Sequence, residues 1–177
     1  MNRIEIPNVD IGMSTIVYDL NDIKFGKYVI IDEMVYICLG KGMSIGNNVH
    51  ISAFSTITGN EYCTLGDFVT ISVGSHLLTG SDDFIGSGFG NPTTPDRFRK
   101  VTAKPIIIEK FSRIGANSVI MPGVIIGIGS TVGANSVVTK NLDPWGVYIG
   151  NKRIKDRDEK GIIKSYNKYI EYMKERK

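Results

Sequence analysis

Two histidines are the side chains of this sequence best suited to acid–base chemistry. His50 precedes Ile51 and His76 precedes Leu77, and both aliphatic residues belong to a repeating pattern. Because imidazole exchanges protons near neutral pH, either histidine could act as a general base. The alternative for each is a surface or interface histidine with an ordinary hydrogen bond, and both interpretations stay open at this point.

Two adjacent aspartates, Asp82 and Asp83, form a second candidate group. Paired carboxylates can orient a histidine or accept a proton, but aspartate is also favoured in turns, where its role is local. Two histidines without a third, and two cysteines without close spacing, Cys38 and Cys63, do not match a zinc site. We therefore expect no metal, and two reduced, packed thiols.

The elements that position these residues follow a six-residue repeat. Aliphatic side chains recur at every sixth position without a break at Ile108, Ile114, Ile120, Ile126, Val132 and Val138. Upstream, pairs of six-residue steps are separated by steps of eight through Phe25, Ile31, Ile37, Ile45, Ile51, Ile57, Leu65, Ile71 and Leu77. A period of six fits neither a helix nor an amphipathic strand, but it fits short strands joined by tight corners, three to a coil. The pattern predicts an all-β fold, a parallel β-helix of about five coils between residues 25 and 143, with one corner widened in consecutive coils.

Alternation of side chains along each strand then places the functional candidates. The repeating aliphatic residue points inward, so the residue before it points outward. Both His50 and His76 therefore face outward, on different faces and in different coils. Within one chain they would not meet, but across a threefold interface they could approach the same cleft.

The repeat is interrupted once and is followed by a helix. An insert over residues 79–104 is rich in Gly and Pro and carries three Phe residues, which favours an ordered arm that reaches onto a neighbouring subunit. Residues from about 156 to 175 have helical spacing, and the apolar stripe of this helix is expected to cap the open end of the coils at Ile162, Tyr166, Tyr169 and Met173. We expect one domain over residues 1–177, with the β-helix from about 23 to 143.

Length and composition restrict the class of protein. The chain has 177 residues, of which 42% are hydrophobic and 22% charged, which suits one globular domain and excludes disorder. No apolar run reaches the roughly 18 residues of a membrane span, and no export signal begins the chain, so a cytoplasmic location is expected. Residues 151–177 hold ten Lys or Arg and five acidic residues. Without an aromatic stacking pattern, this charge indicates a solvated helix face and no nucleic-acid partner.

Two segments carry a resemblance to a known family. The unbroken repeat at 108–140 and the stretch Pro-Trp-Gly-Val-Tyr-Ile-Gly-Asn at 144–151 resemble the hexapeptide-repeat acetyltransferases, in particular the sugar acetyltransferases of polysaccharide biosynthesis. The resemblance implies a left-handed β-helix, a homotrimer with active sites between subunits, and acetyl-CoA as acyl donor. It implies coenzyme contacts at Ala116, Ala134, Thr139, Lys140 and Arg153, and acceptor contacts at Ser52, Asn60 and Asn91.

One departure from that family bears on the chemistry. Related galactoside enzymes place a catalytic histidine where this chain has Asp82. We therefore expect His50 to be the base, with His76 as the alternative, and Asp82 and Asp83 to orient it or bind the sugar. The expected reaction is O-acetylation of a sugar hydroxyl in surface polysaccharide biosynthesis. The alternatives are N-acetylation of a nucleotide-linked amino sugar, for which a weaker base suffices, and a β-helix scaffold without catalysis.

Overall fold

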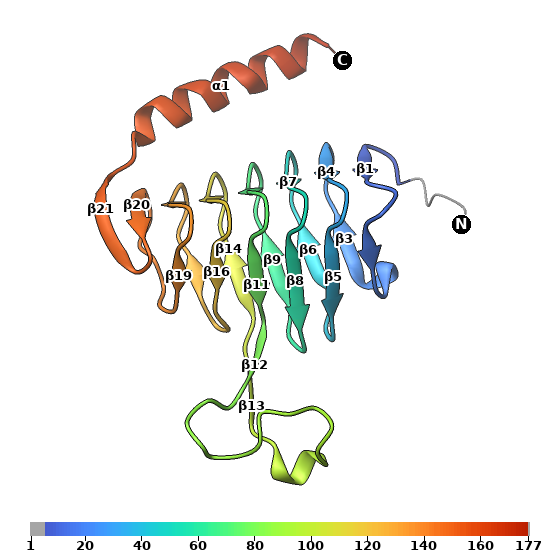
Figure 1. Cartoon of the computed structure of the whole chain (residues 1–177). Helices are drawn as coiled ribbons and strands as arrows, with labels where there is room; N and C mark the ends of the chain where they lie inside the picture. Colours follow the sequence, from blue (N-terminus) through green and yellow to red (C-terminus); the bar gives the residue numbers. More distant parts are fainter. Residues whose placement is uncertain (1–5, 177) are drawn as a thin grey trace.

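The chain folds into a left-handed parallel β-helix, as the repeat and the resemblance predict (Figure 1). The computed structural model describes residues 6–176, so the ends of the predicted domain, residues 1–5 and 177, lie outside the described part. Three parallel sheets form the walls of a prism. Sheet A contains β1 (Val9–Ile11), β4 (Val29–Ile31), β7 (His50–Ile51), β10 (Thr70–Ile71), β15 (Arg113–Ile114), β18 (Thr131–Val132), β20 (Gly146–Ile149) and, antiparallel at its edge, β21 (Lys152–Asp156).

The other two walls complete each coil. Sheet B contains β2 (Ile16–Val17), β5 (Tyr36–Leu39), β8 (Thr56–Gly59), β11 (His76–Leu78), β16 (Val119–Ile120) and β19 (Val137–Val138). Sheet C contains β3 (Ile23–Phe25), β6 (Met43–Ile45), β9 (Cys63–Leu65), β14 (Ile106–Ile108) and β17 (Ile125–Ile126). We call the corners that the chain turns between these walls the A–B, B–C and C–A corners.

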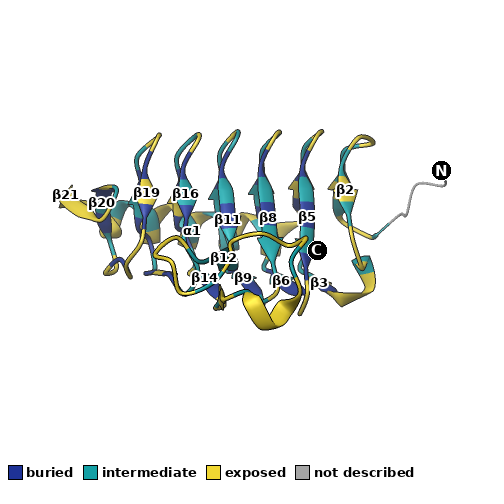
Figure 2. Ribbon diagram, turned by 60° about the horizontal axis from the view of Figure 1, so that its bottom comes forward, coloured by how far each residue is buried: buried dark blue, intermediate teal, exposed yellow. Residues whose placement is uncertain are grey.

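The core is the stack of inward aliphatic side chains that the six-residue period predicts. All six residues of the unbroken repeat, from Ile108 to Val138, are at most 1% exposed. Small residues share the interior, and their hydroxyls are satisfied by the next coil: Ser112 Oγ donates to the Gly127 carbonyl at 2.9 Å. Inward packing therefore fixes which side chains remain for the outer faces (Figure 2).

Strand register aligns the outward side chains as well as the inward ones. Neighbouring coils pair at equivalent positions, so one outward residue from each coil of sheet A falls into a single row. We call this the sheet A row; it consists of Asp10, Ile30, His50, Thr70, Arg113, Thr131 and Val147.

The β-helix begins earlier than the sequence analysis predicts. The strands β1, β2 and β3 form a full coil that pairs with the next one, so the start expected near residue 23 is wrong. The same spacing marks this coil, since Ile11 and Val17 are six apart and Phe25 follows eight later. Every step of eight lies at the B–C corner, and this confirms the single widened corner.

The insert leaves the prism at that widened corner. It starts as an antiparallel hairpin of β12 (Gly80–Asp82) and β13 (Val101–Ala103). Beyond the hairpin it continues as a loop with a short 3-10 helix at Asp96–Phe98 and projects away from the walls (Figure 1). Phe84 and Ile85, which follow β12, are each 88% exposed. These side chains fit the predicted contact with a neighbouring subunit, which stays a prediction.

The C-terminal helix forms as predicted but occupies a different place. Helix α1 (Glu159–Glu175) is capped by Asp158, whose carboxylate accepts from the Gly161 N–H at 2.9 Å. It runs back along the coils instead of covering their open end (Figure 1), so the predicted end cap is wrong. The end coil is instead extended by the β20–β21 hairpin.

A ledge of aromatic side chains explains the helix position. Phe68, Phe111 and Trp145 occupy equivalent C–A corner positions with φ of 58°, 65° and 56°. Tyr166 of α1 lies edge-on to Phe68 and Phe111, with ring centroids 5.5 and 5.3 Å apart. Tyr169 contacts Phe68 at 5.4 Å. The helix therefore docks along a corner through its apolar stripe. No helix within residues 6–176 is long and apolar enough to cross a membrane.

Candidate active site

His50 lies on the sheet A row with a carboxylate beside it. Its Nε2 is 2.9 Å from Oδ2 of Asp32, which follows β4 at the A–B corner of the preceding coil. An ionised carboxylate only accepts hydrogen bonds, so Nε2 is the donor in this pair, and in the neutral imidazole Nδ1 then keeps a lone pair. The imidazole is 43% exposed and can therefore meet a substrate. Asp32 thus provides the orienting carboxylate that the sequence analysis assigned to the insert.

His76 lies on a different wall and makes a different contact. Its Nδ1 is 2.8 Å from the Thr56 hydroxyl on the neighbouring strand of sheet B. Since His50 belongs to sheet A and His76 to sheet B, the two do not share a site within one chain. A role for His76 across a subunit interface stays a prediction.

The two aspartates at the base of the insert are engaged locally. Asp82 forms an ion pair with Arg99, with Oδ1 and Nη2 3.0 Å apart. Partial desolvation opposes ionisation of Asp83, but hydrogen bonds from the backbone N–H groups of residues 85–88 outweigh it and hold the pKa of this carboxyl below its usual value. Both lie beyond the B–C corner, so within one chain they do not orient His50 as expected.

The small residues assigned to the coenzyme lie at the A–B corner. Ala116 follows β15 and Ala134 follows β18, one coil further on. Backbone hydrogen bonds hold the two coils in register: Asn135 N–H donates to the Ala116 carbonyl at 2.8 Å. Short side chains leave this part of the corner open to an extended ligand. The structure therefore brings these two residues together.

The other predicted coenzyme contacts are near the end of the β-helix. The backbone N–H groups of Thr139 and Lys140 both donate to Oδ1 of Asn151, at 2.9 and 3.2 Å. Hydrogen bonds to Asp156, 2.8 Å from Nη2, and to Tyr148 raise the pKa of Arg153 above its usual value. Arg153 is thus committed to the C-terminal hairpin, and its contact with coenzyme phosphates stays a prediction.

The predicted acceptor contacts are dispersed. Ser52 lies at the A–B corner directly after β7, whereas Asn60 is exposed beyond β8 at the B–C corner. Asn91 in the insert uses its Oδ1 to accept from the N–H and hydroxyl of Thr93, both at 2.9 Å. One chain alone does not bring the three together.

The two cysteines lie apart from the histidines and are not paired with each other. Cys63 is fully buried, and desolvation raises the pKa of its thiol to about 12. Cys38 is partly buried and not in a disulfide. Among residues 6–176, no group of three or more His, Cys, Asp or Glu side chains could hold a metal ion.

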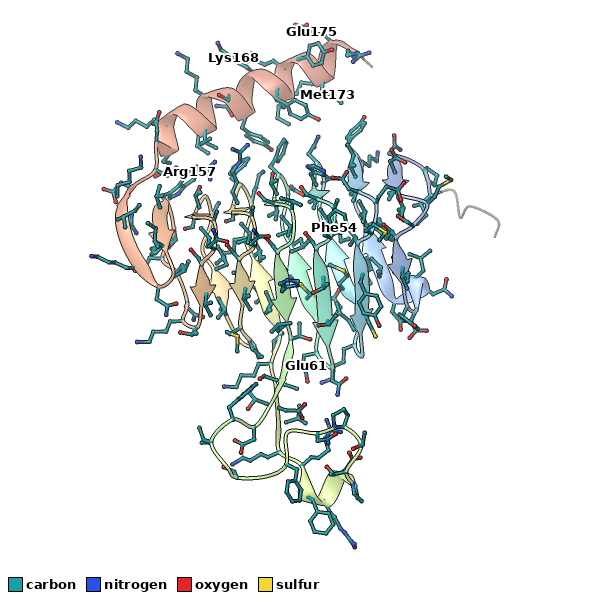
Figure 3. The ribbon with its side chains drawn as sticks, viewed as in Figure 1. Phe54, Glu61, Arg157, Lys168, Met173 and Glu175 are labelled. Carbon is teal, nitrogen blue, oxygen red and sulfur yellow. The ribbon has the colours of Figure 1, made fainter. Side chains whose placement is uncertain are left out.

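A basic cavity lies between α1 and sheet A, and the sequence patterns did not predict it. Arg113 projects from the sheet A row, two coils from His50. Arg157, at the start of the helix, donates from Nη1 to the carbonyls of Phe111 and Gly129 at 2.6 and 2.7 Å (Figure 3). Both line a cavity of about 350 Å³ together with Thr70. The available signal was the position of Arg113 directly before an inward Ile, the same position that His50 has.

Comparisons with known proteins agree with this architecture. Residues 105–140 match the family model described as the hexapeptide repeat of succinyl-transferase. The dTDP-4-amino-4,6-dideoxy-D-glucose acyltransferase of Escherichia coli is 29% identical over 156 residues, 86% of this chain and 81% of that protein. The galactoside O-acetyltransferase of Escherichia coli K12 is 31% identical over 148 residues, 80% of this chain and 68% of that protein. The chain belongs to the hexapeptide-repeat acyltransferases.

A solved member of the hexapeptide-repeat acyltransferases matches this chain beyond its coils. The crystal structure of AntD, an N-acyltransferase from Bacillus cereus in complex with dTDP and 3-hydroxybutyryl-CoA, gives a TM-score of 0.89 and 34% identity. The match covers 94% of this chain and 89% of AntD. The remaining 6% of 177 residues is about eleven residues, fewer than either the insert or α1. Both elements are therefore at least partly included in the match.

Proposed function

We propose that this chain transfers an acyl group from acyl-CoA to the amino group of a nucleotide-linked amino sugar. The observation that carries the proposal is the match to AntD. A variant of AntD that has been solved with dTDP-4-amino-4,6-dideoxyglucose and coenzyme A matches this chain with a TM-score of 0.89. The Escherichia coli relative named for the same amino sugar supports it over 86% of this chain.

The chemistry available at the insert supports an amine acceptor. Asp82 stands where galactoside enzymes are expected to have a catalytic histidine, and its carboxylate is paired with Arg99 at 3.0 Å. A hydroxyl proton is nearly as hard to remove as a proton of water, with a pKa of about 15.7. An ammonium group has a pKa near 8, so a fraction of the amine is already nucleophilic at neutral pH. An amine therefore tolerates the missing histidine better than an alcohol does.

Residue spacing also relates the insert to two positions that have been varied in AntD. Solved AntD variants carry substitutions at a serine and at an aspartate ten residues further along. Ser72 and Asp82 are the one serine–aspartate pair of this chain with that spacing. Ser72 lies at the A–B corner and Asp82 at the B–C corner of one chain. If one site uses both residues, it forms between subunits, as in the homotrimer that the family resemblance implies.

The proposed reaction needs few protein groups. The free amine attacks the thioester carbonyl, the new C–N bond forms, the C–S bond breaks, and coenzyme A leaves as a thiolate. His50 Nδ1 accepts the proton that the nitrogen loses and passes it to the thiolate, with Asp32 stabilising the charged imidazole. The A–B corner at Ala116 and Ala134 would hold the extended arm of the coenzyme, with Thr139 and Lys140 further along. A cytoplasmic location stays a prediction.

O-acetylation of a sugar hydroxyl is the second candidate. The galactoside O-acetyltransferase is 31% identical to this chain, and a His–Asp pair such as His50 with Asp32 is the kind of base that an alcohol requires.

One assay separates the two candidates. Purified protein is given acetyl-CoA with dTDP-4-amino-4,6-dideoxyglucose, or with the matched dTDP-sugar that has a hydroxyl at carbon 4, and thiol release is followed with a chromogenic disulfide. We expect thiol release with the amino sugar and none with the hydroxyl sugar. Faster release with the hydroxyl sugar would replace the N-acyl proposal by the second candidate, and no release with either would contradict both.

A further inference from the structure

The cavity between α1 and sheet A has no place in the reaction described above. One wall is the sheet A row at Thr70 and Arg113, and the other is α1 at Ser165 and Tyr166. Its volume of about 350 Å³ lies within the usual range of small-molecule sites. Its lining mixes aromatic rings, hydroxyl groups and cations, which is the composition of a binding site and not of a core.

The charges in the cavity are uncompensated. Arg113 and Arg157 line it, and none of its lining residues is acidic. Within residues 6–176, neither guanidinium forms an ion pair with a carboxylate. Burial, followed by the charge of Arg113, lowers the pKa of Arg157 from its usual value. Two cations held close together without an acid leave an arrangement that an anion would stabilise.

The position of Arg157 is fixed by the fold. Its Nη1 donates to the carbonyls of Phe111 and Gly129 in successive coils, which holds the guanidinium against the C–A corner (Figure 3). The Arg113 side chain is exposed on the wall and is free to contact a ligand. The rings of Phe68, Tyr166 and Tyr169 complete the cavity and give it an apolar surface against which a nucleoside could pack.

We propose that this cavity binds the nucleoside diphosphate of the acceptor, with the Arg113 guanidinium on the diphosphate. This inference rests on the proposed function and deepens it. Arg113 and His50 are two coils apart in the sheet A row, or roughly 10 Å at the spacing of neighbouring strands. A sugar attached to the diphosphate would extend along this row toward the His50–Asp32 pair. The row thus links recognition of the nucleotide to the proposed base.

The ADP end of coenzyme A carries the same chemistry and is the competing source. We favour the acceptor because the small residues expected to hold the coenzyme, Ala116 and Ala134, line the A–B corner, whereas the cavity opens beneath α1 at the C–A corner. Binding of each nucleotide is therefore measured separately.

The test is calorimetric titration of the full-length protein with dTDP and, separately, with coenzyme A. Arg113→Gln is expected to raise the Kd of dTDP by about tenfold or more, because a charge-assisted hydrogen bond is lost. Arg113→Lys should give a smaller increase, since it keeps the charge without the planar fork. Lys24→Gln is the matched control, because it removes an exposed outward cation from sheet C and should leave dTDP binding unchanged. Coenzyme A binding should be the same in all four proteins.

Each outcome has a distinct meaning. If the wild-type protein binds dTDP and Arg113→Gln binds it equally well, the inference is overturned while the proposed function stands. If Arg113→Gln weakens coenzyme A instead of dTDP, the cavity belongs to the donor and the inference is also overturned. If the wild-type protein neither binds dTDP nor acylates the amino sugar, the proposed function itself fails. Should Arg113→Gln not fold, Ser165→Phe fills the cavity from α1 and must weaken dTDP binding for the inference to survive.

Discussion

Replacing Tyr166 by alanine should release helix α1 from the β-helix. The Tyr166 ring is 5.5 Å from Phe68 and 5.3 Å from Phe111, and Lys110 Nζ lies 4.0 Å from its centroid. Each aromatic pair contributes about 0.5–1.5 kcal/mol beyond its buried area, and an exposed cation–π contact about 0.5–1 kcal/mol. Tyr166→Ala should therefore cost about 1.5–4 kcal/mol of docking free energy.

The contacts left to the helix include those of Tyr169, whose ring is 5.4 Å from Phe68 and whose hydroxyl accepts from Asn48 at 3.0 Å. No residue of α1 is fully buried, and an isolated helix of this length is marginal in water, so an undocked α1 should unfold. Hydrogen exchange measures this local opening directly. At about 1.4 kcal/mol per tenfold change, the amides of α1 should exchange about 10 to 1000 times faster in Tyr166→Ala, while those of the coils keep their protection.

Tyr172→Ala is the matched control. Tyr172 lies on the same helix but is 51% exposed, and its hydroxyl accepts from Arg176 at 2.9 Å. Its removal should leave the exchange of α1 unchanged. Equal exchange in the two variants, or faster exchange in the coils and not in α1, would refute the account of how the helix is held.

Three further predictions follow from single residues. His50→Gln should lower kcat/KM for the amino-sugar acceptor by about 10² or more, and Asp32→Asn by less, with a shifted pH–rate profile; an unchanged profile in both would remove the pair from the reaction. Because the folded-state pKa of Asp83 is lowered, its stabilisation of the insert is present above pH about 4 and is lost as the pH falls through the lowered value. The amides of residues 85–88 should therefore lose protection from hydrogen exchange as the pH falls. In Asp83→Ala the same amides should already be less protected than in the wild type at pH 7. Gly129→Ala should lower the Tm and shift the fluorescence of the single tryptophan, since the added Cβ would lie 2.2 Å from that ring. Gly150→Ala is the control, because Gly150 has a φ of 57° and an added Cβ there would have no atom closer than 3.4 Å. It should therefore show the cost of backbone strain without a steric clash. Equal losses of Tm in the Gly129 and Gly150 variants would argue against the steric explanation.

The six-residue period was sufficient to predict the prism. The inward positions of each coil must hold aliphatic or small side chains. The fold can therefore be recognised from a local sequence pattern, without knowledge of which distant residues are in contact. The outward direction of His50 follows from the alternation of side chains along its strand. The widened B–C corner, from which the insert leaves, follows from the steps of eight residues. Ile11 and Val17 carry the same spacing, so the additional first coil was also within reach of the sequence.

The partners of these residues were not predictable in the same way. Asp32 and His50 come from neighbouring coils, and their contact depends on the direction in which each side chain leaves the wall. The amphipathic stripe of α1 indicates that one face is covered but not by which surface. The covering ledge is built from Phe68 and Phe111 at left-handed backbone positions, where sequence rules favour Gly or Asn.

The sequence by itself therefore determined the β-helix, its inward core and the family to which it belongs. All three can be recognised from inward aliphatic residues that recur at a fixed local period. The tertiary structure alone decided that Asp32 orients His50, that Arg99 neutralises Asp82, and that α1 encloses a cavity with Arg113 and Arg157. These contacts join residues from different coils and from the helix, so they exist only after the chain has wound and the helix has turned back along the C–A corner. Local periodicity does not encode how such elements face one another.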